Sequence, residues 1–524
     1  MSQHVFCHCC PQTSAQNNIE SSAMARRAFL ASMTAGGALL ANVSWGMLAA
    51  DPIDTDPVIA SSPKRKPLVV VPILVHDLPQ RREAASWRNW GGIATQEDAA
   101  KEVVQITQEL DEIQKSADFP VEFLPVIAVT DIQQAKGNAA VADADLILLY
   151  GAGWAINGVQ NFGKDVIIFQ RWRSGPVYLQ YEVVSPRFLR QHTDEPALDN
   201  IRCQDVVTDN LEELTWRLRS LCGLKNSRNQ RILCVGGPGA WAQSAQQCEE
   251  LFATLRKQWN IDLQTVSYDH LGKILDDAQK DERIVRWAEK RAEEYLKIPG
   301  TTLNTKKEFV SNNFILEYIF SRLMQQSDCH AITVSGCMSV IIPQAKTTAC
   351  LTLSLLNDNG YLAFCESDFA VIPSGILLAN ISGRPVFLND PTYPHDQIVT
   401  LAHCTSPRRM DGKNFEPAQI VTHFESDYGA APKVEFKMGQ NGTVILPDFR
   451  SKRWAGFTAK VVDVPFRPIC RSQVDVQYTI EDDLIAERMP GFHWMFSYGD
   501  YSKEIGYALR RVGIEWEDLD KKQF

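Results

Sequence analysis

Residues 361–403 read YLAFCESDFAVIPSGILLANISGRPVFLNDPTYPHDQIVTLAH, and this stretch decides the predicted fold. Three short apolar runs in it end at Glu366, Asp390 and His403. Between the first two lies FAVIPSGILLANISG, an apolar segment with the length of one crossover helix. The pattern predicts a β-strand, α-helix, β-strand unit of a parallel sheet. Because the carboxyl ends of parallel strands line a common crevice, we expect Glu366 and Asp390 on one sheet edge, with His403 close by.

These three side chains suit metal binding and proton transfer. Two carboxylates and an imidazole that converge can hold a hard divalent cation and move protons. Each residue alone has an ordinary interpretation: Glu366 as a helix N-terminal acid, Asp390 as a turn residue before proline, and His403 as a core histidine. Their placement at three successive strand ends favours the functional interpretation. The neighbouring Asp368 is predicted to be the N-cap of the following helix.

Three further histidines are considered. His493 lies in GFHWMFS, residues 491–497, far from the predicted sheet. It would have to fold back over the crevice to join the other three residues, and we include it as a candidate ligand. His395 and His423 are predicted to be surface histidines.

Length and composition limit the class of protein. The chain has 524 residues, of which 45% are hydrophobic and 22% charged, as is ordinary for a soluble globular protein. A chain of this length should form about two to four domains. The net charge of −10 argues against a nucleic-acid partner, which usually requires a basic face.

The pattern of elements predicts two α/β domains and a third, β-rich domain. Strand and helix signals alternate over 66–225 and again over 226–425, which indicates two parallel sheets covered by helices. Short alternating runs after residue 425 predict a small antiparallel β-rich C-terminal domain, 426–524, with a final helix. Residues 1–65 are predicted to be an export leader and linker.

The N-terminus resembles a twin-arginine export signal. Arg26 and Arg27 precede an apolar, uncharged run that is short of the ~20 strongly apolar residues a membrane span needs. We therefore expect a periplasmic protein without a stable membrane span. The alternatives are a membrane anchor or a wrongly assigned start, and the protein is cytoplasmic if the two arginines are not a signal.

The 13 cysteines do not form a disulfide pattern. Three of them precede the leader and the other ten are scattered singly. Cys234, Cys337, Cys350 and Cys365 occupy apolar, core-like segments, where a reduced thiol is the usual state.

Four segments together resemble a known family. Glu366-Ser367-Asp368-Phe369 is similar to a Glu-Gly-Asp-Trp motif, and residues 387–393 are similar to Phe-Met-Glu-Asp-Tyr-Thr-Tyr. Residues 401–404 are similar to Gly-Ser-His-Met, and residues 491–497 to Gly-Gly-x-His-His-x-x-Phe-Ser. In order, spacing and domain layout the chain resembles the L-arabinose isomerase and L-fucose isomerase superfamily over roughly 66–510. One departure is Asn389, which stands where the arabinose-type enzymes have their second glutamate.

The resemblance implies a metal-dependent aldose–ketose isomerase that acts on a monosaccharide through an enediol. Glu366 and Asp390 would be the proton-transfer pair, with Asp390 replacing the missing glutamate. The implied metal is Mn²⁺ or another divalent cation, and the implied assembly is a homotrimer or homohexamer. The implied metal ligands are Glu366, Asp390, His403 and His493.

Two other functions stay open. Gly237 and Gly239 lie in a G-x-G-x-x-A turn after a predicted strand, and Asp269 follows a later strand, which would suit an NAD-dependent oxidoreductase. Pro238 between the glycines and the bulky Trp241 argue against a pyrophosphate site. A non-catalytic exported sugar-binding protein is the other alternative, although it has no need for the carboxylates and histidines.

Weaker candidates for substrate binding lie in the first domain. Arg81, Trp87 and Trp90 follow the strand VVVPILV, and aromatic and arginine side chains at a strand end suit sugar recognition. A helix cap with solvated arginines is the alternative interpretation, and it is slightly favoured for these residues.

Overall fold

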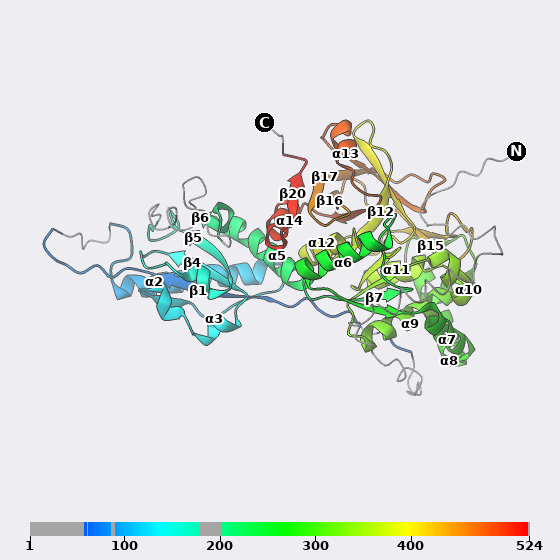
Figure 1. Ribbon diagram of the computed structural model, residues 1–524, viewed down its shortest axis with the longest axis horizontal. Helices are drawn as coiled ribbons and strands as arrows, with labels where there is room; N and C mark the ends of the chain where they lie inside the picture. The colour runs from blue at the N-terminus through cyan, green and yellow to red at the C-terminus, as the bar shows by residue number, and fades with distance from the viewer. Residues whose placement is uncertain (1–56, 60, 85–89, 179–183, 185–200, 522–524) are drawn as a thin grey trace.

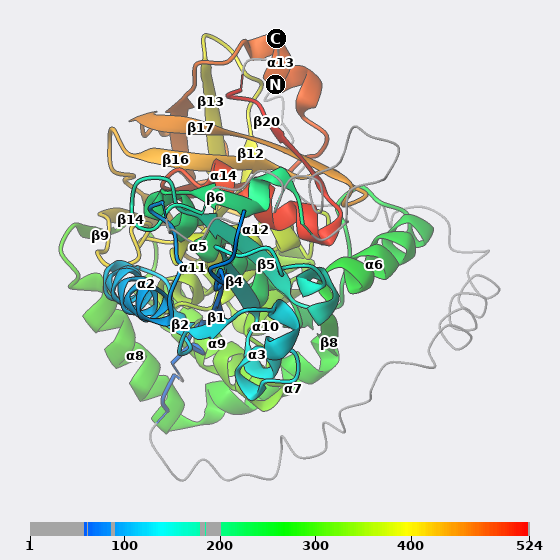
Figure 2. The same cartoon turned by 90° about the vertical axis from the view of Figure 1, so that its left-hand side faces the viewer.

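The computed structural model describes residues 57–59, 61–84, 90–178, 184 and 201–521. The predicted twin-arginine pair Arg26–Arg27 and the candidate Trp87 lie outside these residues. Figure 1 shows a first α/β unit at one end of the long axis and a second α/β unit at the other. A closed antiparallel barrel lies against the second unit, as Figure 2 also shows. The mixed α/β class with parallel sheets and a β-rich C-terminal region is therefore confirmed.

The first unit is a parallel sheet of order β2-β1-β4-β5-β6, with β3 also paired to β1. The run LVVVPILV forms β1, whose side chains are buried on both faces because helices and loops cover the sheet. Helix α2 begins after a capping box formed by Thr95 and Asp98. The elements are β1 (Leu68–Val75), α2 (Gln96–Ser116), β2 (Val121–Phe123), β3 (Ile127–Val129), η2 (Ile132–Ala135), α3 (Ala139–Asp143), β4 (Leu146–Gly151), η3 (Val159–Phe162), β5 (Asp165–Gln170), η4 (Cys203–Asp205), β6 (Val206–Thr208) and α5 (Leu211–Ser227).

Helix α5 joins the first unit to the rest of the molecule. Asn210 caps its N-terminus by accepting from the backbone N–H groups of Glu212 and Glu213. A Cβ atom at Gly223 would lie 2.3 Å from the Ile381 side chain, so glycine permits the close approach of α5 to α12 (Ile372–Ser382). The helix therefore packs on an element that lies directly after the predicted site.

The second unit is a parallel sheet of order β11-β10-β7-β8, in which β11 is an edge strand. Strands β7, β10 and β11 are again buried on both faces, whereas the edge strand β8 has two exposed residues. The elements are β7 (Arg231–Val235), α6 (Ala245–Trp259), β8 (Asp262–Val266), α7 (Tyr268–Lys280), α8 (Glu282–Leu296), α9 (Lys307–Gln326), β10 (Ala331–Val334), the π-helical turn η5 (Cys337–Ile341), α10 (Ile342–Ala345), α11 (Cys350–Asp358), β11 (Leu362–Cys365) and α12.

The C-terminal region closes into a barrel of order β16-β19-β12-β13-β18-β17, because β16 also pairs with β17. All these pairings are antiparallel, and β20 adds to β17 in parallel. The elements are β12 (Phe387–Pro391), β13 (Ile398–His403), β16 (Asn441–Leu446), β17 (Arg453–Asp463), β18 (Ser472–Gln477), α13 (Asp482–Arg488), β19 (Trp494–Tyr498), α14 (Ser502–Leu509), η6 (Arg510–Val512) and β20 (Glu515–Asp518).

The predicted β-strand, α-helix, β-strand unit at 361–390 is wrong in its last strand. Strand β11 and helix α12 form as expected, but β12 pairs antiparallel with β13 and β19 in the barrel. Asp390 and His403 therefore do not lie at the carboxyl ends of parallel strands. They belong to barrel strands, and Nε2 of His403 lies 3.6 Å from the carboxylate of Glu366, the residue that follows β11.

A small separate sheet of order β15-β14-β9 completes the fold, with strands β9 (Thr301–Leu303), β14 (Ala418–Val421) and β15 (Ala431–Val434). In the part of the chain that the structure describes, no single helix has the length and apolar composition to cross a membrane. One bent pair, Cys337–Ala345 with Cys350–Asp358, meets those criteria only when its helices are taken together.

Candidate metal centre

Glu366 directly follows β11 in an unusual backbone conformation. Glu366 has φ 65° and Ser367 has φ 49°, so two consecutive residues other than glycine adopt the left-handed region. Such conformations cost about 1–3 kcal/mol each and persist only where the surroundings fix them. Here the Ser367 N–H donates to the Thr333 hydroxyl of β10 at 3.0 Å. The turn ends the strand sharply and presents the Glu366 carboxylate to the barrel.

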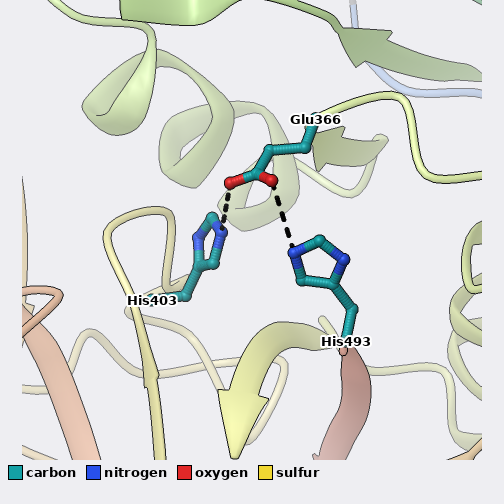
Figure 3. Close-up of side chains that lie close together, drawn as sticks. All are labelled: Glu366, His403 and His493. Carbon is teal, nitrogen blue, oxygen red and sulfur yellow. Dashed lines mark ion pairs between the residues drawn. The ribbon is translucent and has the colours of Figure 1, made fainter. Parts of the chain in front are cut away.

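The Glu366 carboxylate lies between two imidazoles, as Figure 3 shows. Its Oε1 is 3.6 Å from Nε2 of His403, and its Oε2 is 3.5 Å from Nε2 of His493. These separations exceed the usual 2.7–3.2 Å of an N–H···O hydrogen bond. One ligand atom from each residue lies within 4.8 Å of the other two. The three side chains could therefore hold a metal ion.

Asp390 joins this group through the register of the barrel. Asn389 of β12 pairs with Trp494 of β19, which places Asp390 beside His493. The Asp390 Oδ1 lies 3.2 Å from Nε2 of His493. Asn389 points to the other face of β12, where its amide donates to the Phe387 carbonyl at 2.9 Å. The predicted replacement of a glutamate by the next carboxylate along the strand is thus compatible with the local geometry.

Second partners fix the orientation of both imidazoles. Nδ1 of His403 lies 2.9 Å from the Thr405 hydroxyl, and Nδ1 of His493 lies 2.7 Å from Oδ2 of Asp368. Each ring therefore turns Nε2 toward Glu366. A carboxylate on the far nitrogen of a histidine is typical of metal sites, because it fixes the ring and strengthens it as a ligand.

The predicted role of Asp368 as a helix cap is wrong. Helix α12 begins at Ile372, and its N-cap is Val371 without a side-chain hydrogen bond. Instead, Oδ1 of Asp368 accepts from the backbone N–H groups of Trp241 and Ala370 at 3.2 Å, while Oδ2 binds His493. Asp368 therefore orients a histidine that is 125 residues away in the sequence.

The G-x-G-x-x-A turn contributes to this support. The Phe369 N–H donates to the Gly239 carbonyl at 3.1 Å, next to the bond between Trp241 and Asp368. The Trp241 ring stacks on Phe492 with centroids 4.3 Å apart and meets His493 edge-on at 6.5 Å. Asp269, the other element of the dinucleotide interpretation, lies in the first turn of α7.

The electrostatics of the four groups follow from burial and mutual charge. Burial by itself raises the pKa of Glu366, but the two facing imidazoles outweigh it and bring the pKa to about 2. Burial, reinforced by the charge of Glu366, raises the pKa of Asp390 to about 6. Burial lowers the pKa values of His403 and His493, yet the carboxylates reverse this and raise both, that of His493 strongly.

A small cavity of about 10 Å³ adjoins Glu366 and His403. It is lined by Cys337, Cys350, Cys365, Glu366, His403, Cys404, Thr405, His423, Glu425 and Cys470. His423 is 6% exposed, so its prediction as a surface histidine is wrong, whereas His395 is exposed as expected. Cys404 and Cys470 also line this cavity without having been predicted there, although Cys404 directly follows a candidate ligand.

The candidate sugar-binding residues of the first unit lie apart from this centre. Arg81 and Trp90 are exposed residues of the segment after β1, and Trp90 is 77% exposed. Neither residue lines the cavity beside Glu366. Their role in substrate binding stays a prediction.

None of the protein-family models compared with this chain matches it, and none of the curated proteins does either.

Proposed function

We propose that this protein is a metal-dependent sugar isomerase that interconverts an aldose and a ketose through an enediol. The observation that carries the proposal is the meeting of Glu366, Asp390, His403 and His493 at one point, from a parallel sheet and a barrel. The Glu366 and Asp390 side chains are 11% and 14% exposed, and those of His403 and His493 are 4% and 0% exposed, so the carboxylates are the less deeply buried members of the group.

The donor set fits a hard divalent cation, for which we propose Mn²⁺. Among the described residues, Oε2 of Glu366 and Nε2 of His493 are buried and make no hydrogen bond of good geometry, although Oδ1 of Asp390 lies 3.2 Å from that Nε2. Buried polar atoms are seldom left so, and an ion between them would satisfy both. Carboxylate oxygens and imidazoles suit ions of this class. When bound, the cation supplies polarisation of the substrate oxygens.

The protein groups supply the proton transfers. One carboxylate of the pair Glu366 and Asp390 removes the proton from the carbon next to the carbonyl, and the other manages its return at the neighbouring carbon. Asp368 keeps His493 in its orientation and takes no proton from the substrate. The adjoining cavity of about 10 Å³ is too small for a monosaccharide, so in this proposal the sugar does not occupy that cavity.

The proposal extends to export and assembly. Arg26 and Arg27 direct a folded chain to the periplasm, and a homotrimer or homohexamer is the proposed assembly. We assign the Gly237–Ala242 turn to the support of Asp368, because Trp241 donates to that carboxylate.

The test is a panel of pentoses, hexoses and 6-deoxyhexoses incubated with Mn²⁺ in D₂O and followed by NMR. We expect ketose formation, with deuterium at the carbon next to the carbonyl to the extent that the abstracted proton exchanges. Glu366→Gln removes a basic oxygen but keeps the shape, so turnover should fall at least ~10²-fold. Glu317→Gln, a buried replacement of the same kind in α9, is the matched control and should leave turnover unchanged.

Two outcomes would overturn the proposal. Activity that requires added NAD would indicate an oxidoreductase. Sugar binding without metal, and without deuterium incorporation on any member of the panel, would indicate a sugar-binding protein.

A further inference from the structure

A pocket of about 470 Å³ lies at the opposite end of β11 from the Glu366 centre. Leu362, the first residue of β11, lines the pocket, whereas Glu366 follows Cys365, the last residue of that strand. Residues at the starts of β7 and β10 and at the C-terminal ends of α5, α11 and α12 form the rest of its walls. A cavity of this volume accommodates a small molecule. The proposed isomerase activity does not use it.

The pocket is basic, although the chain as a whole carries a net charge of −10. Eight lysine and arginine residues line it, against two aspartates. Lys225 pairs with Asp145 at 2.6 Å, and Arg231 pairs with Asp262 at 3.0 Å. The other six have no carboxylate oxygen of a described residue within 4 Å; they are Lys64, Arg65, Lys66, Arg228, Arg384 and Arg409.

Backbone carbonyls hold the four arginines of this group in place. Each arginine donates to the carbonyl of a residue from another segment of the chain. The pairs are Arg65 with Asn380, Arg228 with Arg511 and Arg384 with Tyr498, each at 3.0 Å, and Arg409 with Asp358 at 3.3 Å. A carbonyl oxygen accepts a hydrogen bond and orients the guanidinium, but it carries no full charge that would neutralise the cation.

Helix ends offset a part of this positive charge. Helices α5, α11 and α12 end at the pocket, and each helix C-terminus is equivalent to about half a negative charge. Three ends supply roughly 1.5 negative charges, well below the charge of the six cations without an ion pair. The capping of helices therefore does not account for the whole cluster.

Asp358 adds little negative charge to the pocket and has an incomplete set of hydrogen bonds. It is 7% exposed, and burial raises its pKa to about 7. Its Oδ1 accepts from the backbone N–H groups of Arg408 and Arg409 at 2.8 and 2.7 Å, whereas its Oδ2 is buried without a hydrogen-bond partner. Nε of Arg409 is buried without one as well. Buried polar atoms are seldom left so, and an oxyanion accepts hydrogen bonds both from a guanidinium and from a protonated carboxyl group.

We propose that this pocket binds a small molecule with two or more phosphate groups. Guanidinium groups match phosphate oxygens in pairs of hydrogen bonds, and such charge-assisted bonds are about twice as strong as neutral ones. The number of cations without an ion pair favours an anion with several charges over a singly charged one. Binding involves no covalent step, and the proposal does not depend on the isomerase activity.

The test is isothermal titration calorimetry of the metal-free full chain with pyrophosphate and with a nucleoside triphosphate in about 0.15 M NaCl. At this ionic strength exposed charges more than ~8 Å apart are largely screened, so loose attraction to the surface is suppressed. We expect saturable binding of one equivalent of either probe or of both. The melting temperature should rise with the probe concentration, because the folded chain alone has the pocket. Inorganic sulfate, which carries fewer charges, should bind more weakly than pyrophosphate.

Variants locate the binding. Arg65→Gln and Arg384→Gln should each weaken it ~10-fold or more, since each removes a charge-assisted contact. The double variant Lys64→Gln/Lys66→Gln changes two exposed side chains, so it should weaken binding without an effect on the packing of the core. Arg286→Gln, at an exposed arginine of α8 outside the pocket, is the matched control and should leave binding unchanged.

The proposal is overturned if neither probe binds to the unmutated chain. Binding that stays unchanged in both arginine variants and in the double lysine variant overturns it as well. It is also overturned if inorganic sulfate or a single-stranded oligonucleotide binds more tightly than pyrophosphate. Glu366→Gln should bind the probes as the unmutated chain does, so failure here is distinguishable from failure of the isomerase proposal.

Discussion

Arg171 and Glu366 occupy equivalent places in the two parallel sheets but have opposite surroundings. Arg171 directly follows β5, and Glu366 directly follows β11. The fully buried Arg171 side chain donates from Nε to Glu102 at 2.5 Å and from Nη2 to Glu109 at 2.8 Å. The nearest charged partners of Glu366 are imidazole nitrogens at 3.5 and 3.6 Å. The buried charge of Arg171 is thus paired by close contacts, whereas that of Glu366 is not.

The difference shows that the end of a parallel strand does not by itself mark a functional residue. Such ends line a crevice in both sheets. Around Arg171 the chain supplies its own counter-charges, which is typical of a structural network. Around Glu366 the chain supplies oriented donors and leaves space between them, which is typical of a site for an ion. The distance from each side chain to its charged partners, and not its position at a strand end, therefore distinguishes Glu366 from Arg171.

The largest effect is expected from Arg171→Met, which tests the structural side of the comparison. Removal of one partner from a buried ion network leaves Glu102 and Glu109 without their cation, so stability should fall by about 3–5 kcal/mol. Urea denaturation followed by circular dichroism measures the loss. Mn²⁺ affinity of the folded fraction should not change, and a fall in that affinity would break the distinction drawn here.

Glu317 of α9 is a buried carboxyl without a counter-charge as close as those of Arg171, and its effect on the stability of the protein should depend on pH. Burial raises its pKa to about 8, and the Asn359 amide donates to its Oε1 at 2.8 Å. The folded chain therefore keeps this proton at neutral pH while the unfolded chain has lost it. Stability from this group is present at low pH and is lost as the pH rises through about 8.

The unmutated protein should therefore lose about 2–3 kcal/mol more than Glu317→Gln between pH 6 and pH 9. Denaturation midpoints of both proteins across this range measure the difference. Parallel curves for the two proteins would show that Glu317 is neutralised by another group in the folded state.

The smallest effect is expected from Asp368→Asn, which tests the functional side. The amide keeps the size of the side chain but is a weaker partner for Nδ1 of His493, so Mn²⁺ affinity should fall ~10- to 100-fold. Isothermal titration calorimetry with Mn²⁺ measures this affinity. The control is Asp269→Asn, the same replacement at an exposed residue of α7. Unchanged affinity would mean that the packing of Trp241 and Phe492 alone orients His493.

The sequence predicted the residues of the centre better than the topology that assembles them. Strand ends and motif similarity predict the set Glu366, Asp390, His403 and His493, and these four side chains lie close together in the structure. The parallel pairing of 387–391 was wrong because an apolar run of five residues fits either kind of sheet. Its partners β13 and β19 are decided by barrel closure, which local patterns do not encode.

The errors at Asp368 and His423 have a related cause. An aspartate shortly before an apolar helix is a common cap, and only the distant His493 gives it another role. His423 lies in a polar segment, THFES, that resembles a surface turn. It is buried beside the same cavity as Cys404 and Cys470, which come from other segments of the chain. The role of Asp368 and the burial of His423 both depend on contacts with segments far away in the sequence. Patterns within a single sequence do not reveal such contacts.

The distance along the chain between the ligands also sets an order of events during folding. Glu366 belongs to the second parallel sheet, whereas His493 enters only with β19, after β16, β17 and β18 of the barrel have been added. Contacts between residues so far apart form late, because the intervening chain must first be ordered. A nascent or truncated chain that ends before β19 therefore lacks a complete centre. Capture of the ion would then report that almost the whole polypeptide has reached its native arrangement.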